Sequence, residues 1–288
     1  MAADPMVQRR RLRTELRTIR VAAGLRQADV AGEMDWSPSK IIRIETGQTA
    51  ISTSDLLALL AYYGVTDRGR VQALVELARS SRASSFYDGY IEAMPPTFRT
   101  YLAFEEAASV LRLYDPTFLP GLVQTERYAK VVLRDVIGCD ADMVDQRWEV
   151  REHRQEQLHQ RPDGPPAMIM VVDEAAVRRW IGGPAVMIEQ LLQLGKMAEL
   201  EHVHLRVLPF TAGAHAWLNT SVSLLEFDDP SLDDMVFVDD MDSEVQSGGD
   251  DDTVPGYLAA FDHLVQQTMP AEDGLSLIAD ELRRLRRA

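Results

Sequence analysis

The fold of the first part of the chain is decided by the stretch Gln27-Ala-Asp-Val-Ala-Gly-Glu-Met-Asp-Trp-Ser-Pro-Ser-Lys-Ile-Ile-Arg-Ile-Glu-Thr-Gly47. Its apolar residues recur at helical spacing up to Met34, and Ser37-Pro38 then supplies an N-cap followed by proline at the first helical position. A second helix is therefore predicted from Pro38 to about Glu45, with Gly47 as its stop. Two helices that meet across so short a turn form a helix-turn-helix.

Three more predicted helices flank this pair. Before it, apolar residues recur at helical spacing over residues 12–19, and Gly24 ends that helix. After it, one helix begins at Ser52, whose spacing to Asp55 resembles a capping box, and another shows apolar positions at i, i+3, i+4 and i+7 from Val71. Five short helices predict a compact all-α domain.

Charge is distributed unevenly along the chain. The 288 residues carry a formal net charge of -15, yet residues 1–83 hold 13 Lys or Arg against 9 Asp or Glu, while the remainder hold 17 against 36. The first helix contains a cluster of arginines that we interpret as a phosphate footprint: Arg9, Arg10, Arg11, Arg13, Arg17 and Arg20. Residues 1–83 therefore carry a net positive charge that suits nucleic acid as a partner, although the net charge of the whole chain is negative.

The second helix of the pair has two distinct faces. If Ile41 and Ile44 face the core, the opposite face carries Ser39, Ile42, Arg43 and Thr46, with Lys40 at its edge. Such a face can enter a major groove of double-stranded DNA, where Arg43 and Lys40 would reach guanine O6 and N7.

The remaining polar residues extend this predicted surface. Ser37 and Ser39 are placed to bond a base edge or a phosphate, and Gln27 to contact a phosphate. Ile42 either contacts a thymine methyl group or simply packs at the helix edge. The predicted DNA-binding residues are Gln27, Ser37, Ser39, Lys40, Ile42 and Arg43.

The runs Gly24–Ala31 and Trp36–Gly47 resemble the Xre family, which has the five-helix fold of phage lambda repressor. The resemblance implies that Gln27 contacts phosphate and that Ser37, Ser39, Lys40 and Arg43 face the groove. Two positions depart from the family. Asp35 stands where glycine is common, and Asp enters the left-handed region more readily than most residues. Ile42 stands where small polar residues are usual.

Beyond a linker at residues 84–96, residues 97–288 are predicted to form an acidic α+β domain. Strands joined without intervening helices favour a small antiparallel or mixed sheet. The predicted strands are 167–173, 202–208, 221–227 and 235–238, and the predicted helices are 97–113, 124–136, 142–160, 184–200, 254–268 and 271–287.

No catalytic motif is evident in this domain, and we expect no cofactor, no metal and no catalytic residue. His202 and His204 share a strand face and His215 lies nearby, but Arg206 occupies the same face and no HExxH is present. The single cysteine, Cys139, has no evident histidine partner. The alternative is an enzyme or a scaffold that carries a helix-turn-helix appendage.

Residues 226–252 hold twelve acidic residues and no basic one. This composition predicts a mobile acidic loop. The favoured role of this stretch is to keep the protein soluble or to match the charge of a partner. The alternative is that it mimics DNA and competes with DNA for the basic residues of 1–83.

The second domain also resembles a known one. Tyr114–Glu126, Asp173–Arg178 and Val207–His215 look like the uncharacterised C-terminal domain that follows an Xre head in many actinobacterial, Streptomyces-like regulators. The resemblance implies a transcription regulator that is frequently encoded beside a small partner protein. It implies no known ligand.

Together these features predict a sequence-specific transcriptional regulator, possessing a C-terminal domain that dimerises and senses a partner protein or a small molecule. A homodimer would place two recognition helices about 34 Å apart on a palindromic operator, as a repressor does. No apolar run is long enough to span a bilayer, so we expect a soluble, cytoplasmic protein.

Overall fold

The structure is a computed structural model that describes residues 3–161, 163–240, 243–248 and 253–288. The chain divides into two compact units. The first comprises Met1–Asp88 with Asp228–Leu232, and the second comprises Gly89–Phe227 with Asp233–Ala288.

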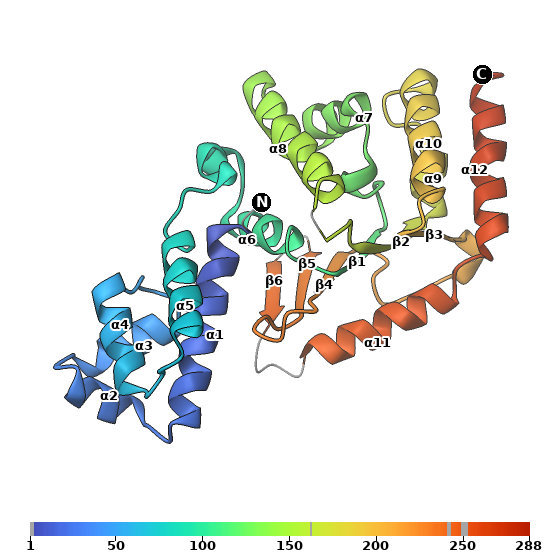
Figure 1. The fold of residues 1–288 in the computed structure, drawn as a ribbon. Coiled ribbons are helices and arrows are strands. Elements are labelled where there is room, and N and C mark those ends of the chain that lie inside the picture. The colour runs from blue at the N-terminus through green and yellow to red at the C-terminus, as the bar shows by residue number, and fades with distance from the viewer. Residues whose placement is uncertain (1–2, 162, 241–242, 249–252) are drawn as a thin grey trace. The chain divides into compact units, whose positions relative to one another are not determined.

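The first unit contains the five predicted helices (Figure 1). They are α1 (Pro5–Ala22), α2 (Gln27–Glu33), α3 (Pro38–Glu45), α4 (Thr53–Tyr62) and α5 (Arg68–Ser80). One apolar cluster joins them, and its fully buried members include Leu16, Ile41 and Leu56. Burial of one face of every helix holds the unit together, because helices this short are marginal on their own.

The second unit is built on a mixed six-stranded sheet with the order β3-β2-β1-β4-β5-β6. Its strands are β1 (Val110–Asp115), β2 (Ala167–Asp173), β3 (Val203–Leu208), β4 (Ser221–Glu226), β5 (Met235–Asp240) and β6 (Ser243–Gly248). The strands β1, β2 and β3 are parallel, whereas β4, β5 and β6 continue the sheet from β1 in antiparallel pairs. The helical N-terminal region followed by an α+β region with a mixed sheet confirms the predicted fold class.

Helices form the crossovers that parallel strands require. Between β1 and β2 the chain forms η2 (Gly121–Val123), α7 (Glu126–Val131), a π-helical turn η3 (Val132–Val136) and α8 (Ala141–His159). Between β2 and β3 it forms α9 (Glu174–Arg178) and α10 (Pro184–Ala198). The remaining helical elements are η1 (Phe86–Ala93) and α6 (Pro96–Glu105) before β1, η4 (Phe210–Ala212), and the C-terminal α11 (Thr253–Gln266) and α12 (Ala271–Leu285).

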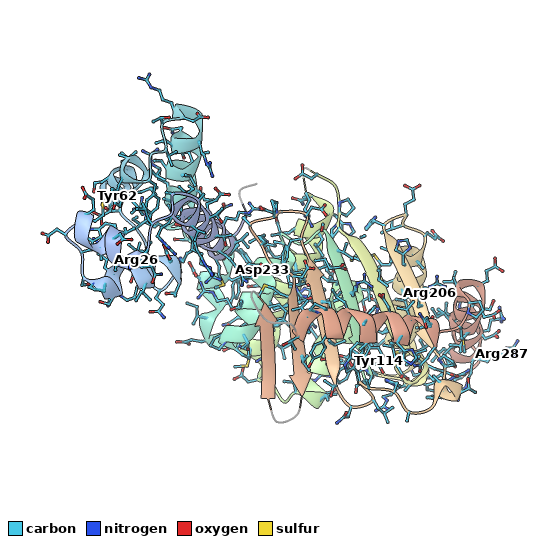
Figure 2. All side chains as sticks on the ribbon, turned by 90° about the horizontal axis from the view of Figure 1, so that it is seen from below. Arg26, Tyr62, Tyr114, Arg206, Asp233 and Arg287 are labelled. Atoms are coloured by element: carbon cyan, nitrogen blue, oxygen red, sulfur yellow. The ribbon has the colours of Figure 1, made fainter. Side chains whose placement is uncertain are left out.

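The C-terminal helix α11 lies across one face of the sheet (Figure 2). Its Phe261 and Leu264 pack into a cluster with Tyr114 of β1, Val222 of β4 and Val236 of β5. The crossover helices α7, α8 and α10 lie over the other face (Figure 1). The sheet is therefore the central layer of a three-layer unit.

The predicted helix over residues 97–113 is wrong in its second half. The helix α6 ends at Glu105, and Val110–Asp115 forms β1. This strand pairs with β2 on one side and β4 on the other. Those partners lie far away in the sequence, so local spacing does not reveal that this segment is a central strand.

The prediction of a mobile acidic loop over residues 226–252 is also wrong for the part of that stretch that forms strands. Met235–Asp240 and Ser243–Gly248 form the antiparallel pair β5 and β6. Alternating apolar residues in β5, such as Val236 and Val238, are buried against the sheet's core cluster. Asp250, Asp251 and Asp252 lie outside the described residues.

Candidate nucleic-acid interface

The turn between α2 and α3 depends on Asp35, whose φ is +52°. The amide of Asp35 donates to the carbonyl of Gly32, and the amide of Trp36 donates to the carbonyl of Ala31 at 2.9 Å. These two bonds form a Schellman motif, which needs a left-handed residue at the position of Asp35. The prediction that Asp35 takes the left-handed region is confirmed.

The helix α3 begins as the sequence indicates. Ser37 is its N-cap residue and Pro38 its first helical residue, although the Ser37 side chain makes no capping hydrogen bond. Instead, the Ser37 and Ser39 hydroxyls lie 3.1 Å apart on the exposed start of the helix. Both residues are therefore exposed at the N-terminus of the helix, where the amide of Lys40 already donates to the carbonyl of Ser37 at 2.9 Å.

The two faces of α3 separate as predicted. Ile41 is fully buried and Ile44 is 4% exposed, while Ile42 is 45% exposed. Ser39 and Arg43 are exposed on the same side as Ile42. The Arg43 side chain makes no hydrogen bond or ion pair within the part of the chain that the structure describes. A long cationic side chain is thus available on the outer face of α3.

Lys40 lies at the edge of this face and is engaged within the unit. Its ammonium group lies 3.0 Å from the Asp55 carboxylate at the start of α4 and 4.0 Å from the centre of the Trp36 ring. Each partner of the ion pair keeps about a third of its side chain exposed, at 34%. Such pairs contribute little stability, so Lys40 can exchange Asp55 for another anion at small cost.

A buried ion pair fixes the position of α3 against α1. The Arg20 guanidinium donates to both Glu45 carboxylate oxygens, at 2.5 Å from Nε and 2.9 Å from Nη2. A further bond runs from Arg20 Nη1 to the carbonyl of Leu25 at 2.8 Å. The bond to Glu45 raises the pKa of Arg20 above its ordinary value, although burial acts in the opposite direction.

This pair corrects the predicted phosphate footprint. Arg20 is buried and faces Glu45, so it does not lie on an outer surface. Arg9 donates to the carbonyl of Ser81, and Arg13 donates to the carbonyl of Thr46 just after α3. Of these three arginines only Arg20 is removed from the predicted footprint, because Arg9 is exposed and the bond of Arg13 lies at the surface.

Gln27 joins the same network. Its side-chain amide donates to Glu45 at 2.7 Å, and the residue is half-buried at the first position of α2. Sequence reasoning missed this network, yet a signal was present. Arg20 lies four residues after Leu16, and Glu45 four residues after Ile41, so both charged residues continue core-facing rows.

The histidines considered for a metal site do not converge. His204 is exposed on β3, the His202 ring lies 6.5 Å from that of His159, and His215 lies 3.3 Å from the Tyr114 hydroxyl. Among the described residues, no group of three His, Cys, Asp or Glu side chains is arranged to hold a metal ion.

Comparison with known families assigns both parts of the chain. Residues 11–74 match a family described as Helix-turn-helix domain. Residues 98–280, well over half of the chain, match the family described as Domain of unknown function (DUF5753). The chain belongs to the DUF5753 family. Comparisons with curated proteins and with solved structures find no match.

In this DUF5753 protein the helix-turn-helix match contains α2, α3 and every predicted DNA-binding residue. The N-terminal unit is therefore a helix-turn-helix domain, which indicates DNA binding and a role in transcription regulation. None of the helices in the described ranges has the length and apolar character needed to cross a bilayer.

Proposed function

We propose that the protein is a transcriptional regulator that reads a specific double-stranded DNA sequence with α3. The observation that carries this proposal is the exposed face of Ser39, Ile42 and Arg43 on a helix whose opposite face, Ile41 and Ile44, is buried. A rigid helix with a polar and cationic outer face fits the major groove.

Each predicted residue has a role in this proposal. Arg43 reads guanine, Ser37 and Ser39 bind a base edge or phosphate, and Ile42 contacts a thymine methyl group. Lys40 leaves Asp55 to bind the DNA, and Gln27 contacts a phosphate while Glu45 holds its side chain.

The wider proposal follows the Xre type of regulator. The protein acts in the cytoplasm as a homodimer on a palindromic operator, and the C-terminal unit receives the regulatory signal from a small partner protein or a small molecule. The proposal treats the chain as a repressor of transcription and not as an enzyme. The domains would be residues 1–83, a linker at 84–96 and residues 97–288.

Recovery of genomic DNA bound by the full chain, followed by binding measurements on the recovered sequence and its single-base variants, tests the proposal. Arg43→Ala should weaken DNA binding by about 1–3 kcal/mol and relax specificity at one base pair. Gln27→Ala should instead weaken binding to all DNA sequences by nearly the same amount. Arg79→Ala is the matched control, because Arg79 is an exposed arginine of α5 paired with Glu76. If Arg43→Ala and Gln27→Ala bind every duplex as the parent does, α3 is not the DNA-reading element.

A further inference from the structure

The C-terminal unit contains a cavity of about 610 Å³. Its floor is a row of sheet residues that pair in register, Leu113 of β1 with Ser223 of β4 and Ser223 with Phe237 of β5. Phe98 and Tyr101 of α6 also line it. An apolar enclosure of this size with a few polar groups is typical of sites for small organic molecules.

One side of the cavity is formed by a row of arginines. The helix α8 places Arg147, Arg151 and Arg154 at i, i+4 and i+7, on one face, and all three line the cavity. Arg154 is neutralised by Glu105, whose two oxygens accept from it at 2.9 and 2.8 Å. The Tyr101 hydroxyl donates to the same carboxylate. Both Glu105 oxygens therefore already have partners, and neither Arg147 nor Arg151 is one of them.

Arg151 has no carboxylate partner within the described residues. Its Nη1 donates to the neutral amide oxygen of Gln124 at 2.8 Å, and its Nε is buried without an acceptor. Burial and the positive charges of Arg154 and Arg147 lower the pKa of Arg151. A half-buried guanidinium with a buried Nε and no counter-ion is costly, so an anion that enters the cavity gains a favourable partner.

Two further features support an anionic ligand. The Thr97 hydroxyl is buried without a hydrogen-bond partner in the described structure, and Thr97 also lines the cavity. The main chain at Gly121 lies beside this guanidinium, because a Cβ there would be in ordinary contact with Arg154 Nη1 at 3.4 Å and with Arg151 Nε at 3.5 Å. An uncommitted hydroxyl and an uncommitted guanidinium edge thus line the same cavity.

The remaining charges set the charge of the ligand. Arg147 donates from Nε to the main-chain carbonyl of Ala93 at 2.8 Å, and no carboxylate of the described ranges pairs with its charge. Asp115 also lines the cavity, where one of its oxygens accepts from the amides of Thr117 and Phe118. Arg154 and Glu105 cancel each other. The charges of Arg147, Arg151 and Asp115 then leave one excess positive charge at the cavity, which a single carboxylate balances.

We propose that this cavity binds a small organic monocarboxylate, whose carboxylate pairs with Arg151 and whose apolar body lies over Leu113 and Phe237 beside Phe98. The site belongs to the C-terminal unit alone and does not depend on how α3 meets DNA.

Calorimetric and ligand-observed NMR titrations of the full chain test the proposal with 3-phenylpropionate and with the neutral 3-phenylpropionamide as matched probe. The carboxylate should bind at least about tenfold more tightly than the amide, because only the carboxylate compensates Arg151. Arg151→Met should weaken carboxylate binding by about 30-fold or more. Arg127→Met is the control, since Arg127 is an exposed arginine paired with Glu189, and it should bind as the parent does.

Arg151→Lys and the thermal stability of the variants separate binding from a structural role. Arg151→Lys should keep a preference for the carboxylate over the amide, since it keeps the charge. Without ligand, Arg151→Met should melt close to the temperature of the parent, because it removes a half-buried uncompensated charge but also leaves the buried Gln124 oxygen without its donor. Failure of the parent to bind 3-phenylpropionate, equal binding of the amide, or a clearly lower melting temperature of unliganded Arg151→Met would overturn the proposal.

Discussion

Arg20 of α1 and Glu45 of α3 form a bidentate ion pair whose side chains are only 11% and 3% exposed. The pair joins the end of the first helix to the end of the candidate recognition helix, and Gln27 of α2 donates to the same carboxylate. Three helices thus converge on one buried charge. The orientation of α3 depends on the pair of Arg20 with Glu45, because a buried bidentate contact at one end of a helix restricts its rotation.

Removal of one partner should destabilise the N-terminal unit. Glu45→Ala leaves the Arg20 guanidinium buried without its counter-ion, so the free energy of opening of α1 and α3 should fall by about 3–5 kcal/mol. Hydrogen exchange of the amides in these helices measures this quantity directly. Glu15→Ala, which breaks the exposed pair with Arg70, is the control and should cost less than about 1 kcal/mol. Equal effects of the two substitutions would contradict the structural role of Glu45.

Backbone conformation at Asp35 yields a second prediction. Asp35→Val should lower the stability of the unit by about 1–2 kcal/mol, because a β-branched residue is strained at φ +52°. Asp35→Gly should stay within about 1 kcal/mol of the parent, since glycine adopts this conformation freely. Asp35 is exposed, so neither change removes core packing. Thermal unfolding of both variants checks the order, and a valine variant as stable as the glycine variant would contradict it.

The pairing of Lys40 with Asp55 predicts opposite effects on DNA binding. Asp55→Asn releases Lys40 and removes a negative charge next to it, so affinity should rise for all duplexes. Lys40→Ala should lower affinity and reduce the slope of log K against log salt concentration by about one. Titrations at several salt concentrations measure both effects. Weaker DNA binding by Asp55→Asn would show that Asp55 acts in some other way.

Histidines of the C-terminal unit predict a pH dependence of stability. Burial lowers the pKa of His153, His202 and His215 below the ordinary value of 6.5. Below that value the unfolded chain binds more protons than the folded one, so stability is fully present above pH 6.5 and is lost as the pH falls.

The melting temperature measured between pH 8 and pH 5 should therefore fall toward acid. His215→Gln should flatten this dependence, because the variant lacks the half-buried imidazole beside Tyr114. His263→Gln, at an exposed position of α11, is the matched control and should follow the parent. A parallel decline in His215→Gln and the parent would exclude His215 as a contributor.

Much of the N-terminal unit was predictable because its signals are local. Ser52 accepts from the amide of Asp55, as its spacing predicts, and Pro38 begins α3. The candidate DNA-reading face follows from the same local spacing, and its role in binding stays a prediction. The partners of its charged residues were not predictable, since Lys40 meets Asp55 and Gln27 meets Glu45 only after the helices pack.

The C-terminal unit shows where local signals end. The local spacing of residues 97–113 predicts one helix, whereas β1 forms there because it pairs with β2 and β4, which are distant in sequence. The sequence predicts only a charged helix for the segment that contains the arginines of α8. That Arg151 lines a cavity follows from the packing of α6 and the sheet beside α8.

The sequence by itself determined the five N-terminal helices and the two faces of α3, because caps, glycine stops and apolar spacing act within a few residues, while the resemblance to the Xre family implied the left-handed turn at Asp35. Only the tertiary structure decided that Arg20 is buried against Glu45, that β1 lies inside the sheet, and that Arg151 lines a cavity where no described carboxylate pairs with it. These outcomes depend on groups brought together from distant parts of the chain, and desolvation acts on a charge only after such packing has removed it from water.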